Sequence, residues 1–141
     1  MMTEKKRLCL LIIVLSSLIT IIASGVVLGQ ASGMVKTAEK AGIGAFLVDG
    51  NGMTLYHFKN DSAGKSMCSG SCIEKWPAYY AEKITTAPRL NTKDFGTIKR
   101  DDGKKQTTYK GQPLYYFAKD KKPGDTFGNG LGSVWQVAPA K

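Results

Sequence analysis

Histidine is almost missing from this sequence, which has one, His57, among 141 residues. Acid–base and nucleophilic catalysis most often place a histidine beside a serine or cysteine, and His57 has no obvious partner of that kind. Acidic residues are also few, 11 against 20 basic ones. They fall mainly in predicted turns, as Asp49, Asp101, Asp102, Asp120 and Asp125. We therefore expect a protein that is not an enzyme and uses no cofactor.

Charge is absent from residues 8–28, which are almost entirely apolar. The basic residues Lys5, Lys6 and Arg7 precede this run, and a basic head before an apolar stretch is typical of export signals. The run is also about as long as a membrane-spanning helix, which needs about 20 residues. We predict that residues 1–29 are a signal peptide or an N-terminal apolar helix that contacts and anchors to the membrane. The remainder is then extracytoplasmic, either secreted or anchored.

The exported part is basic. Residues 1–29 hold three of the 20 basic and one of the 11 acidic residues, which leaves a formal charge near +7. This charge favours anionic envelope polymers, glycans or surface proteins as partners, although it also simply keeps a protein soluble. No nucleic-acid recognition element is present, so we expect no nucleic-acid partner.

Cysteine is scarce, with Cys9 in the apolar run and Cys68 and Cys72 in the exported part. The Cys68-Ser-Gly-Ser-Cys72 spacing does not match the Cys-x-x-Cys redox motif, and Ile73 after Cys72 excludes haem attachment. Disulfides persist outside the cytoplasm, and Ser-Gly-Ser favours a loop that can bring the two sulfurs together. We predict a Cys68–Cys72 disulfide.

Long helical periods are missing after the apolar run. Residues 30–41 are small and polar, which predicts a linker. Beyond it, short β-type runs alternate with turn signals such as the Asp-Gly and Asn-Gly of residues 49–52. The pattern predicts strands over 45–48, 53–58, 106–109, 114–118 and 133–137, and one helical turn over 72–76 capped by Ser71. We expect residues 42–141 to form a mainly β domain, as a small sandwich or barrel-like fold.

An internal repeat organises this domain. Residues 55–61 match residues 114–120 at an offset of 59 positions, and the same offset relates the two tryptophans. A unit this small cannot bury its apolar face alone, so we expect the copies, over approximately 44–80 and 98–139, to pack on each other. The repeated motif residues are Tyr56, Phe58, Asp61 and Trp76 in the first copy and Tyr115, Phe117, Asp120 and Trp135 in the second.

The motif has two interpretations. Alternate residues of a strand share a face, so Tyr56 and Phe58 point one way and His57 the other. The structural interpretation places the aromatic residues in the core and uses each aspartate to fix a turn. The functional interpretation is a carbohydrate platform, with rings that stack on sugars and aspartates that bind their hydroxyls. We favour the structural interpretation.

The repeated Tyr-x-Phe-x-x-Asp resembles the signature of the secreted-repeat lipoproteins, a family with no established function. The likeness runs from about Gly44 to Val137 and includes the Cys68–Cys72 segment and Trp76-Pro77. The resemblance implies an extracytoplasmic two-repeat domain and no particular chemistry. Many members carry a lipid-attachment cysteine at the end of the signal, and this chain has none there, so a retained helix is the more natural anchor.

Two functions follow from these observations. The first is an extracytoplasmic domain that serves binding, adhesion or envelope structure. The alternative is a metal-handling or redox protein, because soft or borderline metal ligands lie close together in the sequence. Against the alternative, His57 occupies a motif position that holds Tyr116 in the second copy. The candidate ligands are His57, Cys68, Cys72, Met53 and Met67.

Overall fold

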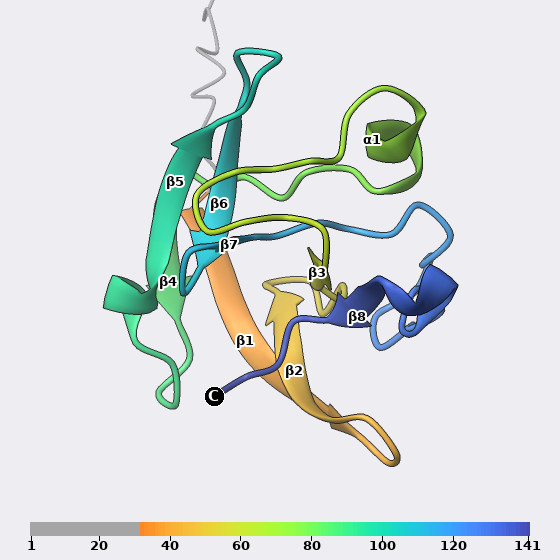
Figure 1. The fold of residues 1–141 in the computed structure, drawn as a ribbon. Coiled ribbons are helices and arrows are strands. Elements are labelled where there is room, and N and C mark those ends of the chain that lie inside the picture. Colours follow the sequence, from red (N-terminus) through yellow and green to blue (C-terminus); the bar gives the residue numbers. More distant parts are fainter. Residues whose placement is uncertain (1–31) are drawn as a thin grey trace, which may run out of the picture.

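The computed structural model describes residues 32–141 and shows a mainly β domain (Figure 1). Three small sheets have the strand orders β2-β1-β4, β3-β8 and β5-β6-β7, and none of them closes into a barrel within the described residues. The strands are β1 (Ser32–Lys40), β2 (Gly44–Asp49), β3 (Tyr56–Phe58), β4 (Lys83–Thr86), β5 (Phe95–Lys99), β6 (Lys105–Tyr109), β7 (Gln112–Pro113) and β8 (Trp135–Val137). The mainly β fold predicted from the sequence is therefore confirmed.

The predicted N-terminal helix and its membrane contact lie outside the described residues. Within residues 32–141, no helix combines the length and the apolar character needed to cross a membrane.

Strand β1 corrects the predicted linker over residues 30–41. It pairs antiparallel with β2, from Val35 opposite Asp49 to Lys40 opposite Gly44, and its first residues pair parallel with β4. Val35 is fully buried. The small and polar sequence of this segment gives little local signal, and its strand conformation comes from pairing with neighbours on both sides. The described domain therefore begins before residue 42.

The predicted turn over residues 49–52 is confirmed. Asp49 Oδ1 accepts the backbone N–H groups of Asn51 and Met53, each at 2.9 Å, and Gly52 adopts a φ of 85° that favours glycine. The return segment pairs with β2 only around Thr54 and Leu55. From Tyr56 it turns away as β3 and pairs with β8, so the predicted strand 53–58 is confirmed in part.

The helices are short. Helix α1 (Ser71–Lys75) matches the predicted helical turn, but its N-cap is Gly70 and no side chain caps it, so the prediction of a Ser71 cap is wrong. The 3-10 helices are η1 (Thr92–Asp94) and η2 (Leu131–Ser133). The predicted strand 114–118 is replaced by irregular backbone with isolated bridges at Tyr115.

The core consists of two clusters of buried side chains. One includes Val35, Leu47, Leu55, Tyr79, Tyr109 and Leu114. The other holds most of the repeated motif, with Tyr56, Cys68, Trp76, Tyr115, Phe117 and Trp135. The second cluster lies where the two repeats meet, and it positions the surfaces described next.

Candidate functional site

Tyr56 and Tyr115 form the centre of the contact between the repeats. Each donates its backbone N–H to the carbonyl of the other, at 2.8 and 3.0 Å. Both side chains are fully buried. Equivalent residues of the two copies therefore meet face to face, as they would across a two-fold axis.

The motif aspartates are exchanged between the copies. Tyr56 Oη donates to Asp120 Oδ2 at 2.6 Å, and Tyr115 Oη donates to Asp61 Oδ2 at 2.7 Å. Burial raises the pKa of both carboxyl groups and, together with the neighbouring carboxylate, the pKa of both tyrosines. Each motif therefore completes the hydrogen bonds of the other, and neither is complete alone.

Four aromatic rings form a continuous stack through the same contact. Trp76 and Trp135 lie in the middle, with ring centroids 3.7 Å apart and planes 4° apart. Phe117 stacks on the outer face of Trp76 and Phe58 on that of Trp135, each at 4.3 Å. Each phenylalanine therefore covers the tryptophan of the other repeat.

The backbone is exchanged in the same way. β3 of the first copy pairs with β8 of the second, and Lys59 N–H donates to Val134 O at 2.7 Å. In the second copy, Tyr116 N–H donates to Pro77 O at 2.7 Å and Ala118 N–H to Lys75 O at 2.9 Å. The expectation that the copies pack on each other is therefore confirmed, and the copies are intertwined.

The stack rules out the carbohydrate platform at the motif. Both faces of Trp76 and of Trp135 are covered by other rings, and the two side chains are 5 % and 6 % exposed. A sugar needs a free aromatic face to stack on. The burial of these residues supports the structural interpretation of the motif, and Phe58, which is half-buried, is the most open of the four stacked rings.

Each motif aspartate also accepts a hydrogen bond from the backbone of the loop that follows it. Asp61 Oδ1 accepts the N–H of Met67 at 2.6 Å, and Asp120 Oδ1 accepts the N–H of Phe127 at 3.1 Å. These two acceptor bonds fix the loops that follow, as expected of turn aspartates. Met67 and Phe127 occupy corresponding places in the two copies and are 55 % and 65 % exposed, so each loop presents a large apolar side chain to solvent.

The disulfide prediction is confirmed, since Cys68 and Cys72 are bonded. Cys68 is buried and corresponds in position to Gly128, which follows Phe127 as Cys68 follows Met67. A Cβ on Gly128 would collide with Trp76 and Tyr56. In the first copy a disulfide therefore closes this loop. In the second copy the backbone of Gly128 packs directly against the rings, where there is no room for a side chain.

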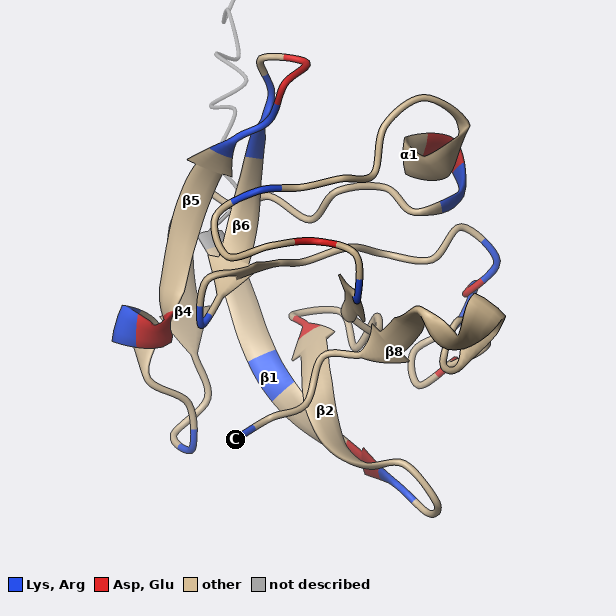
Figure 2. Ribbon diagram, in the orientation of Figure 1, with Lys and Arg blue, Asp and Glu red and all other residues tan. Residues whose placement is uncertain are grey.

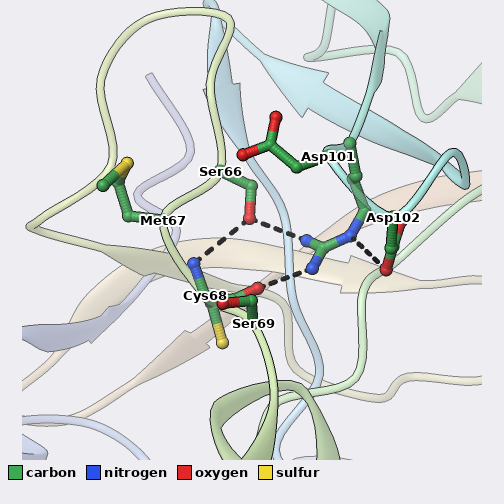
Figure 3. Close-up of a pocket in the computed structure, with 7 residues that line it drawn as sticks. Ser66, Met67, Cys68, Ser69, Asp101 and Asp102 are labelled. Carbon is green, nitrogen blue, oxygen red and sulfur yellow. Dashed lines mark hydrogen bonds and ion pairs between the residues drawn. The ribbon is translucent and has the colours of Figure 1, made fainter.

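Arg100 ties the disulfide loop to the β5–β6 hairpin (Figure 3). Its guanidinium donates to Ser66 Oγ and Gln106 Oε1, each at 2.7 Å, and to Cys68 O at 2.5 Å. Asp102 Oδ2 lies 3.4 Å from Nε. The pocket of about 100 Å³ at this place is lined by a guanidinium with four of its five N–H donors already bonded within the protein, so it offers little to an anionic ligand.

The candidate metal ligands do not form a site. Cys68 and Cys72 share the disulfide and supply no thiolate, and Met67 is exposed to solvent. Residues 32–141 contain no group of three His, Cys, Asp or Glu side chains able to hold a metal ion. His57 Nε2 is buried without a hydrogen-bond partner, and burial lowers the pKa of His57 to about 4.

A cleft of about 440 Å³ opens beside the ring stack, between α1 of the first copy and η2 of the second. These two helices lie on the same side of the domain (Figure 1). The rings of Trp76, Phe117 and Trp135 give it an apolar floor, and the other lining residues are Leu131, Gly132, Val134, Glu74, Lys75, Ala118 and Lys119. Leu131 is 41 % exposed. The cleft exists only because the copies are joined.

The repeated motif can now be compared with known proteins. A family model described as a secreted repeat of unknown function matches residues 37–79 and 96–139. The chain belongs to this family. The two matched segments correspond to the two intertwined copies, and the family's description supports the extracytoplasmic location predicted from residues 1–29. Searches of curated proteins and of solved structures gave no match.

Sequence reasoning missed several residues that shape this secreted-repeat domain. Arg100 and Ser66 carry no motif, and only the structure shows that the guanidinium reaches the disulfide loop. Leu131 lies in a glycine-rich stretch that resembles an ordinary turn. The signal that could have identified this region was the alignment of the copies, since the second copy has glycines where the first has cysteines.

Proposed function

We propose that this secreted-repeat chain is a non-catalytic binding domain of the cell envelope, and that the cleft between α1 and η2 takes an apolar segment of another surface protein. The observation that carries the proposal is the apolar floor of the cleft. It is formed by the edges of rings that are locked in place by the intertwined copies. A preformed apolar cleft with a few charged groups at its rim is the usual form of a binding site.

The floor favours an apolar group over a sugar. The indole faces are covered by Phe58, Phe117 and each other, so the two indoles offer only their edges. Leu131 and Val134 extend this apolar surface. Aromatic residues are enriched at protein interfaces.

The rim favours an acidic partner. Lys75 and Lys119 lie at the cleft with one acidic residue, Glu74, and both lysines are exposed. Elsewhere the basic residues are distributed over several loops and strand ends, with acidic residues among them (Figure 2). The overall positive charge would attract any acidic partner, whereas the cleft would select one with an apolar segment. Acidic residues beside that segment would pair with the two lysines.

Binding of the purified full-length protein to isolated envelopes tests this proposal. We expect the binding that depends on Leu131 to be abolished when the envelopes are treated with protease and retained when their glycans are digested. Leu131→Asp and Lys119→Glu are each expected to weaken binding at least ten-fold. Lys93→Glu, on η1 away from the cleft, makes the same charge change at an exposed site and is expected to have little effect.

Two results would contradict the proposal. One is equal binding by the parent and by Leu131→Asp, provided that the variant melts at the parent's temperature. The other is Leu131-dependent binding that survives protease but not glycan digestion, which would assign the partner of this cleft to the glycans.

A further inference from the structure

A second cleft, which shares no lining residue with the first, has a different character. Its volume is about 360 Å³, and it lies between the start of β1, the turn after β2 and the segment before β4. Tyr79, Tyr80 and Tyr116 contribute three aromatic side chains, and Asp49 and Asn51 contribute polar groups. Only Asp49 among the lining residues is charged, and its charge is negative, so an anionic ligand does not fit this surface.

Asp49 is held in position and keeps acceptor capacity. Asp49 is 8 % exposed. Its Oδ1 accepts two backbone N–H groups of the turn, and its Oδ2 accepts the hydroxyl of Tyr116 at 2.8 Å. A carboxylate has about four acceptor positions, so a ligand donor can still be accommodated.

Tyr79 supplies an unused donor. Its side chain is 4 % exposed, and its hydroxyl has no hydrogen-bond partner. Burial and the nearby Asp49 carboxylate raise the pKa of Tyr79 to about 12, so the hydroxyl keeps its proton. A buried polar group without a partner is costly to a fold, and a ligand hydroxyl that accepted this proton would remove the cost. Because the hydroxyl is closed off from water beside Gly33, the ligand gains this bond only when the start of β1 moves outward.

Tyr80 supplies the aromatic surface that the motif tryptophans lack. Its ring is 39 % exposed, and the ammonium of Lys105 lies 5.9 Å from its centroid. Gly33 lets β1 approach closely, since a Cβ there would collide with Ala81 and the Tyr79 hydroxyl. An exposed ring beside a donor and an acceptor matches a ligand whose hydroxyls both donate and accept.

We infer that this cleft, with Asp49, Tyr79 and Tyr80, is a binding site for a short hydroxyl-rich glycan. The exchange of roles between the copies does not produce an equivalent cleft elsewhere in residues 32–141. The second copy has Ala138 at the position of Tyr79, and the first has His57 at the position of Tyr116. The inference does not depend on the protein-docking function proposed for the cleft at the ring stack.

Calorimetric titration of the full-length protein with the trisaccharides of glucose and of N-acetylglucosamine tests the inference. We expect at least one of them to bind, and Tyr80→Ala to weaken that binding at least ten-fold. Tyr79→Phe gives a sharper test. It should raise the melting temperature of the free protein, because it removes an unpartnered hydroxyl, and it should weaken glycan binding at least five-fold.

Tyr109→Phe is the matched control, because it removes a hydroxyl that donates to Lys141 O outside the cleft, and it should leave glycan binding unchanged. Leu131→Asp should also leave it unchanged, which separates this site from the docking cleft. The inference is overturned if neither trisaccharide binds at millimolar concentration. It is equally overturned if Tyr79→Phe and Tyr80→Ala bind as the parent does.

Discussion

Trp76 of the first repeat stacks on Trp135 of the second almost in parallel, and the outer face of each indole is covered by a phenylalanine of the opposite copy. The stack joins the copies through side chains in the same place where Tyr56 and Tyr115 join them through the backbone. Substitutions of these four rings therefore test the contact between the repeats.

The two ends of the stack should differ in energy. Phe117 is 8 % exposed, so we expect Phe117→Ala to lower the free energy of unfolding by about 3–5 kcal/mol. Phe58 is half-buried, and Phe58→Ala should cost clearly less. Urea denaturation followed by far-UV circular dichroism measures both. Equal costs, or a Phe117→Ala variant as stable as the parent, would contradict the buried stack.

The exchange of aspartates predicts a specific pattern of coupling. Tyr56→Phe or Asp120→Asn should each cost about 1–3 kcal/mol, because each disrupts a buried hydrogen bond. The double variant should cost less than the sum, with a coupling of about 1 kcal/mol or more.

The matched control pairs Tyr56→Phe with Asp61→Asn in the same copy. Asp61 bonds Tyr115 instead, so these two costs should add to within about 0.5 kcal/mol. The exchanged arrangement would be contradicted if Tyr56→Phe were coupled to Asp61→Asn and its cost were additive with that of Asp120→Asn.

His57 should make the fold sensitive to mild acid. Its pKa falls from 6.5 to about 4 on burial, so between these values the unfolded chain binds a proton that the folded chain does not. Stability is then lost as the pH falls below about 6.5, and the loss is complete below about 4. A change of one in pKa corresponds to about 1.4 kcal/mol, so the loss approaches about 3 kcal/mol.

His57→Gln isolates this effect from the titrating carboxyl groups. The variant cannot take up the proton, so its stability relative to the parent should rise as the pH falls from 7 to 4. Unfolding free energies measured at several pH values provide the comparison. A difference between variant and parent that stays constant with pH would show that His57 titrates normally in the folded state.

The disulfide predicts a labelling pattern. Alkylation of the exported protein without reduction should label neither Cys68 nor Cys72, and both should be labelled after reduction, with peptide mapping to separate them from Cys9. The closed loop is short, so replacing both cysteines by alanine should cost about 2 kcal/mol in the chain-entropy model. Full labelling of both thiols in unreduced protein would mean that the bond does not form outside the cytoplasm.

Local patterns in the sequence were sufficient for the turns, the disulfide and the repeat. Asp49 and Gly52 determine their turn through bonds within five residues, and the aromatic motif could be recognised as core because its spacing recurs. β1 could not be predicted, because Ser32–Lys40 becomes a strand only between β2 and β4.

The exchange of aspartates between the copies also could not be predicted from the sequence. Identical motifs are compatible with each aspartate bonding its own tyrosine or that of the other copy, and only the paths of β3 and β8 decide. The two clefts follow from these paths. Their lining residues are brought together from segments that share no pattern, such as Lys75 with Leu131 and Gly33 with Tyr79.

The intertwining of the copies limits how early the chain can fold. The bonds that join Tyr56 to Tyr115 and β3 to β8 connect residues far apart in the chain, and such contacts slow folding. A chain that crosses a membrane from its N-terminus exposes the first copy before the second is available, so its core cannot close early. The protein would therefore remain extended while it crosses, and it would reach its native fold only after the segment around Trp135 has emerged.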